Sequence, residues 1–193
     1  MQKWKRVETV DGPRFRSALA VHEVALLRNL VDSIIGMLDS REFSAPSDEL
    51  EQITGMRIGN SRPPSDATTR RLLPDYYRAP EHDDGPDAQS LNSALRSLHE
   101  PAIIDAKREA AQQLLATLPE QAGRIELTQN QADAWIAAVN DIRLALGTLL
   151  NIGPEGPEQV PANDRAAGQI NVYQWLTVLQ EFLVVALLGA PRR

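Results

Sequence analysis

The chain has 193 residues, of which 42% are hydrophobic and 24% are charged, the composition of an ordinary soluble globular domain. It contains no cysteine, which excludes disulfides, thiolate metal sites and cysteine nucleophiles. Its net charge is −6, and tight autonomous binding to DNA needs a concentrated basic surface, so we expect any contact with DNA to be weak or indirect.

The N-terminal residues predict a β-hairpin followed by a long helix. Two short extended runs flank Asp11, Gly12 and Pro13, and Asp-Gly is a frequent hairpin turn, although the proline suits a looser one. A helix should run from about residue 20 to residue 38, because apolar residues recur there every three or four positions. These residues are Leu27, Leu30, Val31, Ile34 and Leu38. No apolar run of the signal-peptide type is present at the N-terminus, which favours a cytoplasmic protein.

Residues 42–87 are rich in proline and predict a loop-containing insert. Two short helices fit inside it. One would lie at about residues 48–55. The other would be capped by Ser65 or Asp66 and would end before Pro74, because the residue before a proline disfavours the helical conformation.

The second half of the chain predicts four further helices and one short strand. A helix over residues 88–98 should end before Pro101, and a new helix should begin there, because proline suits a first helical turn. An extended piece at residues 124–127 leads to Thr128, which with Gln131 forms the capping box of the next helix.

The final helix, over about residues 166–188, contains the most hydrophobic stretch of the chain. Its length is close to that of a membrane span, but Glu181 and several uncharged polar residues interrupt it, and a charge near mid-bilayer is costly. We therefore expect a buried core helix and no membrane contact. The elements together predict a mainly α, single helical domain over residues 1–193, with about five to seven helices and a short N-terminal β-hairpin or small sheet.

An offset of 108 residues aligns an extended run and helix in the first half with the same arrangement in the second. The simpler interpretation is that two amphipathic helices share a period, and we favour it. The alternative is that the two units are related and that their extended runs pair in a small sheet. The aligned pairs are Leu19/Leu127, Leu27/Trp135, Val31/Val139, Ile34/Ile142 and Leu38/Leu146.

No sequence motif of an enzyme is present. The chain lacks a glycine-rich phosphate loop, a Gly-x-Ser-x-Gly elbow and a His-Glu-x-x-His pair. Its three histidines are His22, His82 and His99, which show no metal-ligand spacing. We expect a protein that is not an enzyme and that has no cofactor or metal site.

The segment RRLLPDYYR is the most distinctive candidate for partner binding. It combines arginine and tyrosine, which are enriched in protein interfaces. The alternatives are that the arginines form ordinary surface ion pairs, or that a tyrosine turns inward at the edge of the core. The candidate residues are Arg70, Arg71, Tyr76, Tyr77 and Arg78.

Polar residues lie next to the apolar faces of the two most hydrophobic helices. Asn140 and Arg143 belong to the helix at residues 134–152, and Gln174 and Glu181 belong to the final helix. Polar groups between packed helices must satisfy one another. We therefore expect a structural polar clamp in which Arg143 forms a salt bridge with Glu181. A ligand pocket is the alternative, but the four residues include no nucleophile and no metal-binding set.

Three stretches of the chain are RRLLPDYYR, AWIAAVNDIRLALGTLLNI and VYQWLTVLQEFLVVAL. Together they closely resemble segments of the AosR-like family of actinomycete oxidative-stress regulators. The resemblance extends over essentially the whole chain. It implies a mostly helical, cytoplasmic, non-enzymatic regulator of transcription that contacts a stress-response sigma factor or RNA polymerase. A scaffold or adaptor without a transcriptional role, for example in protein turnover, is the alternative, and a homodimer is left open.

One feature departs from the family. The redox switch proposed for its members is a disulfide between nearby cysteines, and this chain has no cysteine. Either the sensing mechanism does not carry over to this chain, or a partner senses oxidation.

Overall fold

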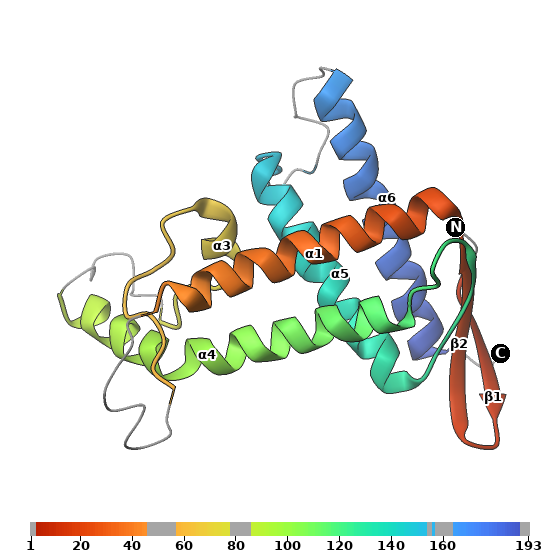
Figure 1. Cartoon of the computed structure of the whole chain (residues 1–193), viewed down its shortest axis with the longest axis horizontal. Coiled ribbons are helices and arrows are strands. Elements are labelled where there is room, and N and C mark those ends of the chain that lie inside the picture. The colour runs from red at the N-terminus through yellow and green to blue at the C-terminus, as the bar shows by residue number, and fades with distance from the viewer. Residues whose placement is uncertain (1–2, 46–56, 78–85, 154–155, 157–163, 190–193) are drawn as a thin grey trace.

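The computed structural model describes residues 3–45, 57–77, 86–153, 156 and 164–189. This part of the chain contains five helices and three strands, so the predicted mainly α fold with a small sheet is confirmed. The elements, labelled as in Figure 1, are β1 (Lys5–Thr9), β2 (Gly12–Leu19), α1 (Val21–Phe43), α3 (Ala67–Leu72), α4 (Pro86–Thr117), β3 (Gly123–Leu127), α5 (Gln129–Leu149) and α6 (Asp164–Leu188). The helix predicted near residues 48–55 lies outside the described residues.

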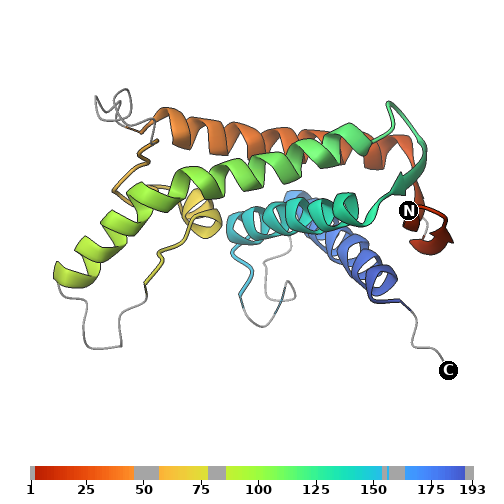
Figure 2. The ribbon, with the colours of Figure 1, turned by 90° about the horizontal axis from the view of Figure 1, so that it is seen from below.

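The helices form two layers. α1 and α4 lie side by side in one layer, and α5 and α6 form the other (Figures 1 and 2). α5 occupies the centre, because it packs against α1, α3, α4 and α6. Its Trp135 is fully buried, and four of the five apolar residues predicted for the buried face of α1 are buried as well. These four are Leu27, Val31, Ile34 and Leu38.

The three strands form an antiparallel sheet in the order β1-β2-β3. Ser17 pairs directly with Ile125, and the 108-residue offset maps one of these residues onto the other. The offset also relates Phe15 to Gly123 and Leu19 to Leu127. Phe15 pairs with Leu127 and Leu19 pairs with Gly123, so the offset turns one of these pairs into the other with the two strands exchanged. The two strands are therefore related by a local two-fold axis, and each enters its helix through a single residue. The two extended runs therefore pair in a small sheet, as the alternative interpretation expected. Every antiparallel pair of strands has such an axis, so a relationship between the two strand–helix units stays a hypothesis.

The helix caps follow the sequence closely. Thr128 Oγ1 accepts the N–H of Gln131, whose Oε1 accepts the N–H of Thr128, so the predicted capping box is confirmed. Asp66 caps α3 by accepting the N–H of Thr69 at 2.7 Å. This backbone hydrogen bond holds the pKa of Asp66 below its ordinary value.

The predicted break before Pro101 is wrong, because α4 continues through it. Proline has no N–H, so the carbonyl of Ser97 loses its partner in the helix. The N–H of Gly59 donates to this carbonyl at 2.7 Å instead. A contact from outside the helix thus replaces the missing hydrogen bond, and local sequence rules do not anticipate it.

The prediction of a buried core helix is only half correct for α6. One side packs on α5 and the sheet and buries Leu176, Leu179 and Leu183. The opposite side exposes Val178 and Val185. Among the described residues, Ala167–Leu188 is the one segment long and apolar enough to cross a membrane by length and composition.

Candidate functional site: the surface around α3

A buried ion network holds the segment that contains α3. Arg96 and Glu100 lie one turn apart in α4, and their side chains are each 1% exposed. Nη1 of Arg96 lies 2.8 Å from Oε2 of Glu100. Glu100 also accepts from Arg41 of α1 at 2.8 Å. Arg96 donates to the carbonyl of Leu73 and to Asp75. Buried charges are tolerated only when they are paired, so the network fixes the chain after α3 against both long helices.

The α3 segment buries one side in the core and exposes the other to solvent. Leu72 and Leu73 are 2% and 3% exposed and pack into the core, whereas Arg70 and Arg71 are exposed. The Arg70 guanidinium donates to the carbonyl of Pro64 at 2.8 and 3.1 Å. Arg71 makes no hydrogen bond or ion pair with any described residue, so its charge remains available to a ligand or partner.

Tyr76 and Tyr77 follow α3 on the surface, 36% and 39% exposed. Both backbone N–H groups donate to Oδ1 of Asn92, and Nδ2 of Asn92 donates to the Tyr77 carbonyl. The Tyr76 ring lies 6.0 Å from that of His99. Partial burial and the charge of Glu100 raise the pKa of Tyr76. Neither tyrosine is buried in the core, and Arg78 lies outside the described residues. We call Arg70, Arg71, Tyr76 and Tyr77 the α3 surface.

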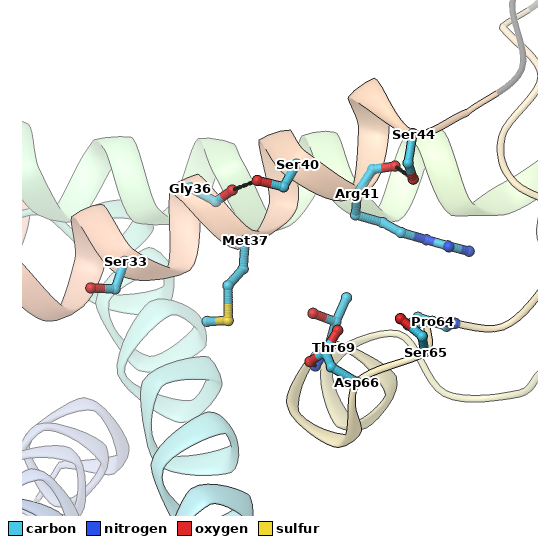
Figure 3. A pocket seen from close by; sticks show the side chains of 10 residues that line it. All are labelled: Ser33, Gly36, Met37, Ser40, Arg41, Ser44, Pro64, Ser65, Asp66 and Thr69. Atoms are coloured by element: carbon cyan, nitrogen blue, oxygen red, sulfur yellow. Dashed lines mark hydrogen bonds between the residues drawn. The ribbon is translucent and has the colours of Figure 1, made fainter.

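A hollow of about 670 Å³ lies between α1 and α3 (Figure 3). The side chain of Met37 extends from α1 into it. Its two charged lining residues are already engaged, Arg41 with Glu100 and Asp66 with the cap of α3. The hydroxyls of Ser33 and Ser40 donate to carbonyls of their own helix. The hollow therefore offers shape and small polar residues, but no assembled nucleophile and base among the residues that line it.

A second hollow of about 500 Å³ lies between α3, α5 and α6. It brings together Arg71 and Arg143, which were predicted from the sequence to serve separate roles, partner binding and the polar clamp. Apolar walls are provided by Leu144, Ile152 and the ring of Tyr173. We call it the arginine hollow.

The predicted salt bridge between Arg143 and Glu181 is wrong. The Nε of Arg143 donates to Thr177 Oγ1 at 3.0 Å, and its Nη1 donates to Gln180 Oε1 at 2.6 Å. Thr177 and Gln180 lie on the side of α6 that faces α5. Gln174 and Glu181, seven residues apart and thus on one side of the helix, are both exposed. Among the described residues, Arg143 is therefore the one predicted clamp residue that hydrogen-bonds across to α6. Its partner Thr177 lies one turn from both Gln174 and Glu181, but Thr177 and Gln180 are half-buried whereas Gln174 and Glu181 are exposed.

The remaining polar residues near the clamp differ in their contacts. Asn140 is half-buried, and its side chain makes no hydrogen bond within the described part of the chain. Its neighbour Asp141 is buried and pairs with Lys107 of α4 at 2.6 Å. The described residues contain no cluster of acidic or histidine side chains that could hold a metal ion.

Residues 1–187 match a family described as a domain of unknown function, DUF2017. The chain belongs to this family. It is 62% identical to the "Oxidative stress regulator AosR" of Mycobacterium tuberculosis (strain H37Rv) and of Mycobacterium bovis, over 98% of this chain and 89% of each relative. It is 60% identical to the "Putative oxidative stress regulator AosR" of Mycobacterium leprae, with the same coverage. No solved structure matches the chain. The resemblance read from the sequence is thus confirmed.

In this member of DUF2017, the residues that sequence reasoning missed are those that hold the site together. Arg96 and Glu100 have the spacing of a helical ion pair, which was a usable signal. Their near-complete burial could not be foreseen, because a surface pair has the same spacing. Thr177 shares the polar seam of α6 with Gln174 and Glu181 and could be seen in the sequence, but only the packing of α6 showed that Thr177 and Gln180 contact Arg143.

Proposed function

We propose that this protein is a non-enzymatic regulator of the response to oxidative stress, and that it acts by binding a sigma factor or RNA polymerase through the α3 surface. The names of its mycobacterial relatives support a regulatory role in oxidative stress. The single structural observation that carries the proposal is the anchoring of the α3 segment by the buried pair Arg96–Glu100. A rigid support lowers the entropic cost of binding for the arginine and tyrosines presented on it.

The chemistry of the α3 surface fits a protein partner. Tyrosine and arginine often carry much of the binding energy of an interface. Arg71 has no partner in the described fold, so binding an acidic group would not first require an internal ion pair to break. Since the chain has a net charge of −6, we propose that contact with DNA is weak and runs through the partner.

The alternative is a scaffold or adaptor without a transcriptional role, since the same surface could hold another class of protein. Co-purification separates the two. The tagged full chain would be incubated with purified mycobacterial RNA polymerase, with and without stress-response sigma factors, and the affinity of any complex measured. We expect the wild-type chain to form a complex and the variant Arg71→Glu/Tyr77→Ala to bind at least tenfold more weakly, about 1.4 kcal/mol.

Arg124→Glu is the matched control, because Arg124 is an exposed arginine on β3, outside the α3 surface. It should bind like the wild type. If neither polymerase nor sigma factor binds, the transcriptional role is wrong. If both variants bind like the wild type, the α3 surface is not the contact.

A further inference from the structure

We propose that the arginine hollow is a binding site for a small organic anion, whose carboxylate or phosphate group lies between Arg71 and Arg143. Both arginines line the hollow, one from α3 and one from α5. No described lining residue is an aspartate or glutamate, although the chain as a whole carries a net charge of −6. The local charge is therefore opposite in sign to that of the protein. This inference goes beyond the proposed function and does not rest on it.

Hydrogen bonds hold the Arg143 side chain in place, but no carboxylate neutralises its positive charge. Thr177 and Gln180, which accept from its Nε and Nη1, are uncharged, and its guanidinium carbon lies 5.4 Å from the centre of the Tyr173 ring. The buried Arg96 is different, because it contacts two carboxylates. A fixed, unpaired guanidinium needs little reorganisation to bind an anion, and its planar donors match a carboxylate or phosphate.

The end of α5 forms part of the wall. Asn151 has a φ of 53°, the left-handed conformation that closes many helices. The N–H groups of Asn151 and Ile152 donate to the carbonyls of Thr148 and Gly147, which are therefore not free to repel an anion. The helix dipole leaves about half a negative charge at this end. Two guanidinium charges outweigh it.

The size and walls of the hollow indicate the class of ligand. Its volume of about 500 Å³ lies within the usual range for small-molecule sites. Leu144, Ile152 and the Tyr173 ring provide an apolar side, so the anionic group should be attached to a short carbon skeleton. Two arginines favour a group with two negative charges, which indicates a phosphate ester or a dicarboxylate.

The test uses the full-length chain alone with two probes, inorganic phosphate and succinate. Titrations at constant ionic strength would be followed by NMR at the side-chain Nε–H groups of the arginines. We expect saturable shifts at Arg71 and Arg143 with at least one probe, and no saturable shift with chloride. Phosphate and succinate as separate titrations distinguish a phosphate from a carboxylate ligand.

Arg71→Gln is the decisive variant, because Arg71 makes no hydrogen bond or ion pair in the described fold and its loss should not disturb folding. We expect at least tenfold weaker binding of the probe. Arg124→Gln removes an exposed arginine elsewhere and should bind as the wild type does. Shifts that are absent, unsaturable, equal with chloride, or unchanged in Arg71→Gln would each overturn the proposal. Since no partner protein is present, these outcomes are independent of the sigma-factor or polymerase contact.

Discussion

Gly59 lies against the ring of Pro101 in the middle of α4. A Cβ atom at position 59 would come within 2.8 Å of Pro101 Cδ, so no larger residue fits without a shift. The N–H of Gly59 donates to the Ser97 carbonyl that Pro101 leaves without a helical partner. The proline thus creates a free acceptor and the glycine allows a donor to reach it. This contact ties the chain that precedes α3 to α4.

Gly59→Ala should therefore destabilise the fold by about 1–3 kcal/mol through overpacking, measured by urea unfolding. Gly36→Ala is the control, since a Cβ there meets nothing within 4 Å in the middle of α1. It should be neutral or stabilising by about 0.5–1 kcal/mol, because alanine favours a helix over glycine. Equal effects of the two substitutions would show that the contact with Pro101 is not tight.

Arg96→Ala should cost about 3–5 kcal/mol, because it leaves Glu100 buried beside one remaining arginine. The matched exposed case is Arg57, which pairs with Glu42 and Asp105 and whose side chain is 47% exposed. Arg57→Ala should change stability by less than about 1 kcal/mol, since exposed ion pairs contribute little. Urea unfolding of both variants measures the two changes in the free energy of unfolding. An Arg96→Ala variant as stable as Arg57→Ala would rule out the network as an anchor of the α3 segment.

Arg143→Ala should destabilise the protein by about 1–3 kcal/mol, because it removes two charge-assisted hydrogen bonds between α5 and α6. A double-mutant cycle with Thr177→Val should show coupling of at least ~0.5 kcal/mol. The same cycle with Glu181→Gln should show none, since Glu181 is exposed and forms no ion pair with Arg143. The reverse result would restore the originally predicted salt bridge.

Burial raises the pKa of Asp141 above its ordinary 3.8, and the nearby Lys107 offsets this only in part. The folded state then binds the proton more tightly than the unfolded state, so this group makes stability fall as the pH rises through the window above 3.8. Asp141→Asn, which stays neutral, should match or exceed the wild type in stability at neutral pH. This advantage should shrink as the pH falls toward 3.8. Urea unfolding of both proteins across this pH range measures the difference in stability. A variant less stable than the wild type by more than ~1 kcal/mol at neutral pH would contradict the prediction.

The local structure of the chain was largely readable from its sequence. The capping box at Thr128, the cap at Asp66, the apolar stripe of α1 and the strand before α5 all depend on residues a few positions apart. Such features follow from helix and strand periodicity and from the hydrogen-bonding needs of helix ends, which do not require knowledge of distant partners.

Tertiary structure alone decided which polar groups meet. Several polar residues of α6 lie within one turn of each other, and the packing of α6 on α5 decided that the half-buried Thr177 and Gln180, and not the exposed Gln174 and Glu181, contact Arg143. A helix could end before Pro101 or continue through it. It continues, because the N–H of Gly59 satisfies the Ser97 carbonyl that the proline leaves without a helical partner. Arg71 and Arg143, 72 positions apart in sequence numbering, line one hollow only because α3 packs on α5. Long-range packing sets these outcomes, since the free energy of a polar group depends on what surrounds it once it leaves water.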